Sequence, residues 1–265
     1  MGVSKTGKTP ASDYKRDVSV SQTTNTGFDS TTRKLCSGDG ADSAASLSDD
    51  VLSVQPVNDD TTGTMLVKNN AGNNILAVDT VNSKVLAGAS QVAVNTQYAY
   101  FGVTSAMGLS TVAGTHYAVS FNNVYLQTAI TMGTGTEPST SYDISANNSG
   151  NDMASVLWYI PDNITVDQVY WMAGGHAAAG DTINIHLLSF DFDAGVGAGK
   201  GDLSNGIVVA GGADKVSLGY ENVIYESIAP ASADVDAGKV CMVTFESNGT
   251  NSDYSINATV KYHIR

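Results

Sequence analysis

The sequence has few cysteines, few charged residues and no long apolar run. Its 265 residues include two cysteines, Cys36 and Cys241, without CxxC spacing. A disulfide-rich scaffold is therefore excluded, and two reduced or buried thiols are expected, with one disulfide as the less favoured alternative. No stretch has the length of a transmembrane span, and the first residues lack the apolar core of a signal peptide, so we expect synthesis in a cytoplasm.

Charge is scarce and unevenly distributed. Charged residues make up 15% of the chain, while Gly, Ser, Thr, Asn and Ala are abundant, a balance typical of strands and tight turns. Residues 1–35 contain six of the thirteen Lys and Arg and three Asp, so they carry a formal charge of +3 and the remainder carries −16. The acidic body is not expected to bind nucleic acid, whereas the basic segment is expected to dock on an acidic surface; a solvated tail is the alternative.

The first residues match two unrelated motifs. MGVSKTGKT fits both the nucleotide-binding pattern G-x-x-x-x-G-K-[ST] and the myristoylation pattern M-G-x-x-x-[ST]. A nucleotide-binding loop needs a buried strand before it and a helix after it, but Met1 alone precedes Gly2, and residues 11–30 lack apolar residues at helical spacing. We therefore expect both matches to be coincidences of composition.

The sequence shows no pattern of a catalytic or metal site. The four histidines stand in separate segments without metal-ligand spacing: His116, His176, His186 and His263. Three of them, His116, His186 and His263, are expected on exposed strand faces. Asp191 and Asp193 could share a hard cation, but Ca²⁺ takes roughly six oxygens or more, so a solvated strand end is favoured. Lys200 lies in the glycine-rich segment GVGAGKGD, which fits no phosphate-binding motif. We expect neither an enzyme nor a bound cofactor or metal.

Residues 1–50 are expected to form an extended docking arm. They contain almost no large apolar residues and end in SGDGADSAASLSDD, so they cannot pack a core of their own. Charge complementarity with a partner surface would come from the basic side chains Lys5, Lys8, Lys15, Arg16, Arg33 and Lys34.

Residues 51–96 are expected to form a short neck of repeated strands. A ten-residue repeat aligns Met65 with Ile75 and Val85, and the turn sequences NNAGN and DTVNS separate the copies. Three such strands have too little apolar surface to be stable as a single layer. Copies of the chain are one possible cover, giving a fibre-like shaft, and the chain's own C-terminal domain is the other. The residues expected at the contact are Met65, Leu66, Ile75, Leu76, Val85 and Leu86.

Residues 97–265 are expected to form a β-sandwich, because short strands recur with turn signals about every ten residues. The segment DTINIHL should place Ile183, Ile185 and Leu187 inward, and residues 254–265 alternate most clearly. SVLWYIP, apolar on both faces, is expected to be a central strand. Aromatic residues of this region could form a sugar-stacking platform: Tyr98, Tyr100, Tyr142, Tyr220 and Trp171.

Three segments resemble appendage proteins of tailed bacteriophages: head fibres, capsid decoration proteins and short tail fibres. LVKNNAGNNILAVDTVNSKVLAG is similar to the short-strand shafts of phage fibres, and WYIPDNITVDQVYWMAGG looks like a strand pair of their β-sandwich knobs. DVDAGKVCMVTFESNGTNSDYSINATVKYHI looks like the closing hairpin of such knobs. The resemblance covers residues 60–265 and implies a homotrimer anchored by its N-terminal region, and the short shaft favours a compact decoration or short fibre.

The sequence therefore predicts an all-β protein with an extended arm (1–50), a β-repeat neck (51–96) and a jelly-roll-like β-sandwich (97–265). The predicted function is that of a non-enzymatic virion structural protein, made in the host cytoplasm, that docks on capsid or tail proteins through residues 1–50. The alternative is a carbohydrate-binding β-sandwich that recognises cell-surface glycans in adhesion. Membrane insertion is not expected.

Overall fold

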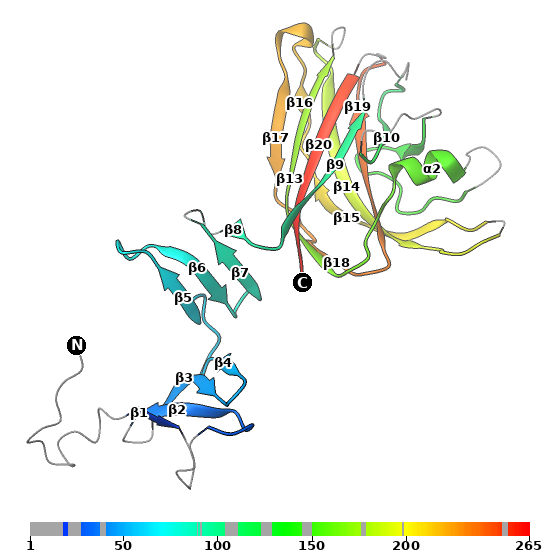
Figure 1. Cartoon of the computed structure of the whole chain (residues 1–265). Helices are drawn as coiled ribbons and strands as arrows, with labels where there is room; N and C mark the ends of the chain where they lie inside the picture. The colour runs from blue at the N-terminus through cyan, green and yellow to red at the C-terminus, as the bar shows by residue number, and fades with distance from the viewer. Residues whose placement is uncertain are drawn as a thin grey trace, which may run out of the picture. The chain divides into compact units, whose positions relative to one another are not determined.

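A computed structural model of the chain divides into two compact units, between Val94 and Asn95, close to the predicted start of the sandwich. The described residues are 18–20, 28–37, 41–88, 90, 92–103, 111–122, 129–144, 150–175, 179–197, 199–250 and 254–265. Within them strands predominate, and the helices are α2 (Gly150–Val156) and the 3-10 turn η3 (Gly219–Glu221) (Figure 1). The prediction of an all-β fold is confirmed.

The first sheet of the N-terminal unit is antiparallel, with the order β1-β2-β3-β4. Its strands are Val18–Val20, Arg33–Ser37, Asp42–Leu47 and Leu52–Val54. Strands therefore occur within the segment that was expected to be an extended arm, and β4, from the expected neck, pairs with β3. No side chain described in β2, β3 or β4 is buried. The scarcity of apolar residues in this segment correctly indicated that its described residues form no core. Backbone hydrogen bonds nevertheless pair its strands.

The second sheet of this unit is the neck sheet, with the order β5-β6-β7-β8. Its strands are Met65–Lys68, Asn74–Asp79, Lys84–Ala87 and Val92–Ala93. The predicted turn chemistry is present: Asn69 Oδ1 accepts hydrogen bonds from two backbone N–H groups at 3.0 Å, and Asp79 Oδ1 accepts one from Asn82 at 3.0 Å. Ser83 adopts a φ of 53° in the second turn. Short side-chain bonds therefore set both hairpins.

The C-terminal unit is a β-sandwich of two antiparallel sheets. Sheet I has the order β17-β13-β20-β9, formed by Ile224–Ile228, Ile164–Gly175, Tyr254–Ile264 and Thr96–Val103, and β18 (Asp234–Val235) pairs with β13. Sheet II has the order β11-β10-β19-β14-β15, formed by Thr131–Thr134, Thr115–Val119, Val240–Ser247, Thr182–Phe192 and Leu203–Gly211. Two short strands extend sheet II: β12 (Trp158–Tyr159) pairs with β19, and β16 (Lys215–Val216) pairs with β14.

The eight main strands of the sandwich pair in a nested order along the chain: β9, β10, β13, β14, β15, β17, β19 and β20. The first pairs with the eighth, the second with the seventh, the third with the sixth and the fourth with the fifth. One long hairpin rolled into two sheets has this pairing, which is the one expected of a jelly-roll-like sandwich.

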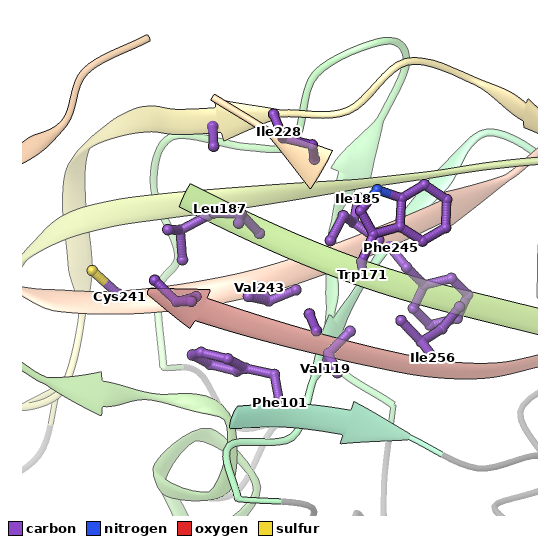
Figure 2. Close-up of a cluster of buried hydrophobic side chains, with 14 of the residues drawn as sticks. Phe101, Val119, Trp171, Ile185, Leu187, Ile228, Cys241, Val243, Phe245 and Ile256 are labelled. Atoms are coloured by element: carbon purple, nitrogen blue, oxygen red, sulfur yellow. The ribbon is translucent and has the colours of Figure 1, made fainter. Parts of the chain in front are cut away.

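Sheet II has an apolar core on each face. The core between the two sheets includes Phe101, Trp171 and Phe245 (Figure 2), together with the predicted inward residues Ile183, Ile185 and Leu187. The second core lies on the other face of sheet II and includes side chains of α2 and β11: Met153, Val156 and Met132. Because sheet II lies between these cores, β19 is buried along its whole length.

The segment SVLWYIP differs from its predicted structure. It contains the end of α2, the short strand β12 and the residues next to them, rather than one central strand. Val156 packs in the second core, whereas Trp158 and Ile160 pack in the core between the sheets. The segment is apolar throughout because it contacts both cores in turn, a pattern that a buried strand shares.

Candidate functional site

Two of the six predicted docking residues are described, and both pair with acids of their own unit. Arg33 donates hydrogen bonds of 2.5 and 2.9 Å to the Asp29 carboxylate, and Lys34 Nζ lies 3.5 Å from Asp42 Oδ2. The bonds from Arg33 lower the pKa of Asp29 to about 2. The charge expected for docking therefore depends on Lys5, Lys8, Lys15 and Arg16, which lie outside the described residues.

The neck sheet has one continuous apolar face. Residues directly opposite each other in an antiparallel pair share a face, so the pairs Met65↔Val78 and Val78↔Val85 place three strands in register. We name the set on this side the open apolar face: Met65, Val67, Leu76, Val78, Val85, Ala87 and Val92. Met65, Val67, Val85 and Val92 are 36–42% exposed. This face carries no charged side chain.

The opposite face of the neck sheet is mixed and partly covered. It carries Leu66, Ala77, Asp79, Lys84, Leu86 and Ala93. Ala77 and Asp79 on this face are the buried residues among those described in the N-terminal unit. Thr61 and Thr64, in the segment before β5, form hydrogen bonds with Thr80, the residue after β6. The two buried residues thus lie on the mixed face, whereas four of the seven residues of the open apolar face are exposed.

The six residues predicted at the contact do not all lie on one face of the neck sheet. Met65, Leu76 and Val85 lie on the open apolar face, and Leu66 and Leu86 lie opposite. Ile75 is the extra residue where the register shifts between β5 and β6. The repeat selected two neighbouring residues in each strand, such as Met65 and Leu66, but neighbouring side chains of a strand point to opposite faces.

The outer face of sheet I carries tyrosines set among polar side chains. Tyr98 and Tyr100 alternate with buried Ala99 and Phe101 on β9, and both are 49% exposed. The register places Thr259 between Tyr100 and Tyr170, in line with Ser227. We name ten residues of this outer face the tyrosine face: Tyr98, Tyr100, Tyr170, Met172, Tyr225, Gln168, Ser227, Asn257, Thr259 and Lys261. Lys261 is the one charged residue of this set.

Two of the five aromatics predicted for a sugar-stacking platform lie on the tyrosine face, Tyr98 and Tyr100. Trp171 points into the core and donates its Nε1–H to Glu226 Oε2 at 3.0 Å. Tyr142 packs against the second core, and Tyr220 is 76% exposed on η3, outside sheet I. Tyr170 and Tyr225 were missed, although the alternation of β13 around Trp171 could have placed Tyr170 outward.

The prediction that His116, His186 and His263 are surface residues is wrong. They are 0%, 3% and 4% exposed, respectively. His116 and His186 lie on the face of sheet II that was expected to be polar and solvated, and that face is covered. His263 Nδ1 lies 3.1 Å from both carboxylate oxygens of Asp167. His176 lies outside the described residues.

Asp191 and Asp193 have protein partners, and Cys241 is buried whereas Cys36 is half-buried. Asp191 accepts hydrogen bonds from Lys239 Nζ at 2.5 Å and Asn205 at 2.7 Å, and Asp193 pairs with Lys200 at 2.7 Å. Burial raises the pKa of Cys241 to about 12, so its thiol is protonated at neutral pH. Across the described ranges, no three His, Cys, Asp or Glu side chains are placed to hold a metal ion.

No protein-family model matches the chain, and no curated protein or solved structure matches it. No helix in the part of the chain that the structure describes is long and apolar enough to cross a membrane. The functional argument therefore depends on two surfaces, the open apolar face and the tyrosine face.

Proposed function

We propose that this chain is a non-enzymatic virion structural protein, an appendage or decoration of a tailed bacteriophage that self-associates through its neck sheet and projects the β-sandwich outward. The observation that carries this proposal is the open apolar face, which belongs to a unit with only two buried residues among those described. The sandwich that follows in the chain has two apolar cores of its own. The sequence resemblance to phage appendages supports the choice of class.

The open apolar face is proposed to be covered by other copies of the chain. Small sheets with one apolar face are marginal as a single layer and need a second layer. The face contains seven apolar residues and no charge, and it therefore suits a homologous apolar surface better than a polar partner. The resemblance implies three copies, which would close around a threefold axis.

The basic residues Lys5, Lys8, Lys15 and Arg16 are proposed to dock the assembly on an acidic surface of the capsid or tail, because they carry most of the positive charge of residues 1–35. The test of the virion role is mass spectrometry of purified particles of a phage that encodes the chain. We expect the chain among the structural proteins in multiple copies per particle. Its absence from purified particles, with expression in infected cells, would contradict the proposal.

A second candidate function is glycan binding on the tyrosine face. Exposed tyrosine rings offer an apolar surface for sugar rings, and their hydroxyls and the adjacent Gln, Asn, Ser and Thr side chains can hydrogen-bond sugar hydroxyls. Tyr100 and Tyr170 stand on strands separated by β20, which is about 10 Å at two strand spacings, so the face is wider than one sugar ring. Because Lys261 is its one charge in a chain of net charge −13, a neutral glycan fits best.

Replacing Tyr100 by Ala is expected to weaken glycan binding by about tenfold, or ~1.4 kcal/mol, because one stacking platform is removed. The measurement is a glycan array with the full-length protein, followed by calorimetry on the best neutral hit. Tyr220→Ala is the matched control, since Tyr220 is 76% exposed but lies on η3, and it should leave binding unchanged. An array without hits above background, or equal losses in both variants, would exclude this function.

A further inference from the structure

Two buried histidines face each other across β19 on the side of sheet II that holds the second core. His116 on β10 pairs with Glu246, and His186 on β14 pairs with Thr244. The imidazole centroids are 5.2 Å apart, and the rings meet edge to face at 75°. Neither histidine contributes to the tyrosine face or to the open apolar face.

Both imidazoles contact one turn, residues 135–137, which follows β11. His116 Nε2 lies 2.9 Å from the carbonyl oxygen of Gly135, and His186 Nε2 lies 3.6 Å from Glu137 Oε2. A carbonyl only accepts hydrogen bonds, so His116 must carry its proton on Nε2. The Nδ1 atoms of both rings are buried and have no hydrogen-bond partner among the described residues. The neutral rings thus hold this turn from two different strands.

Charged groups reach the pair from three elements. Glu137 lies in the turn itself, Glu246 on β19, and Asp214 between β15 and β16, where it accepts a 2.6 Å hydrogen bond from Asn184 Nδ2. Burial lowers the pKa of both His116 and His186, and the Glu137 carboxylate opposes this lowering in each case. At His186 the neighbouring ring of His116 lowers the pKa further. Burial, followed by Asp214, raises the pKa of Glu246.

We propose that His116 and His186 form an acid-sensitive latch, in which the neutral rings hold the 135–137 turn on sheet II and uptake of a proton by each ring releases it. One added proton on His186 is opposed by burial but compensated by the Glu137 carboxylate. A second proton would place two cations with ring centroids 5.2 Å apart in a site shielded from water, where their repulsion is strong. Opening separates the charges and exposes the face of sheet II beneath the turn.

The direction of the pH effect follows from the lowered histidine pKa values. The closed state binds fewer protons than the open state. The latch is therefore fully stable above the ordinary histidine pKa of about 6.5, and it weakens as the pH falls from there toward the lowered pKa values of the closed state. Glu246 acts in the opposite direction, because its raised pKa gives stability at low pH that is lost as pH rises through that pKa. Acid opening is therefore assigned to the histidines.

The test is hydrogen exchange of the Gly135 amide, which donates a 3.0 Å hydrogen bond to Gly114 O in the closed state. In the full-length protein between pH 7.5 and 4.5, after correction for intrinsic exchange, we expect the opening constant to rise by up to about tenfold per pH unit for each additional proton that the open state binds. An opening constant that stays constant over this range would overturn the proposal.

The variant His116→Gln, His186→Gln removes both titrating groups, and a glutamine at 116 can still donate a hydrogen bond to Gly135 O. It should show no acid-dependent opening, whereas the control His263→Gln, on β20 beside Asp167, should retain it. Equal acid dependence in the double variant would overturn the latch. If the double variant does not fold, NMR titration of the wild-type imidazoles decides: coupled titration below about 6.5 supports the latch, and two independent ordinary values contradict it.

Discussion

Substitution of Val67 by Asp is expected to convert the assembled protein into monomers. Val67 is 42% exposed on the open apolar face and pairs with Leu76. In an assembly that covers this face, the new carboxylate would be buried without a partner, which costs several kcal/mol per copy. Since three chains of 27.4 kDa weigh 82.2 kDa, native mass spectrometry should show the 82.2 kDa species replaced by one of 27.4 kDa.

Leu66→Asp is the matched control for this substitution. Leu66 is the preceding residue of β5, is 41% exposed and lies on the opposite face. A carboxylate there lies on the mixed face, outside the open apolar face, so assembly should persist. If Leu66→Asp dissociated the assembly and Val67→Asp did not, the contact between copies would lie on the mixed face, which contradicts our account.

Truncation of Trp171 to Ala is expected to destabilise the sandwich by about 3–5 kcal/mol, the range found for large aromatic side chains in cores. Trp171 is 1% exposed in the core between the sheets and also bonds Glu226. The measurement is urea unfolding of the full-length chain followed by far-UV circular dichroism. Assembly through the neck and stability of the sandwich should respond independently, because each unit contains its own sheets.

Met172→Ala provides the comparison for Trp171→Ala. Met172 is the next residue of β13, but it is 48% exposed on the outer face of sheet I, so truncation should change stability by no more than about 0.5 kcal/mol. Equal losses in the two variants would contradict the assignment of inner and outer faces on β13, and with it the tyrosine face.

Alternation in the sequence predicted much of the sandwich but not what covers each sheet. Ile183, Ile185 and Leu187 were placed inward by period two, and they pack in the core between the sheets. The same pattern put His186 on a solvated face and failed, because α2 and residues 129–144 supply a second core there. Period two identifies the residues that share a face, whereas the layer over that face comes from distant segments.

The open apolar face and the tyrosine face depend on strand register, which a single sequence does not specify. The repeat revealed the strands around Met65, Ile75 and Val85, but the bulge that displaces Ile75 follows from the pairing of β5 with β6. Likewise, Tyr100 and Tyr170 face the same side because β9 and β13 both pair with β20. Contacts between strands so far apart in the chain are set by tertiary packing rather than by local pattern.

The central claim is that copies of the chain associate through the neck sheet, and the native mass of the purified full-length protein tests it most directly. Native mass spectrometry at low micromolar concentration should show a species of 82.2 kDa, three times the chain mass of 27.4 kDa. A single species of 27.4 kDa would contradict the claim, since the open apolar face would then be covered within one chain or left exposed.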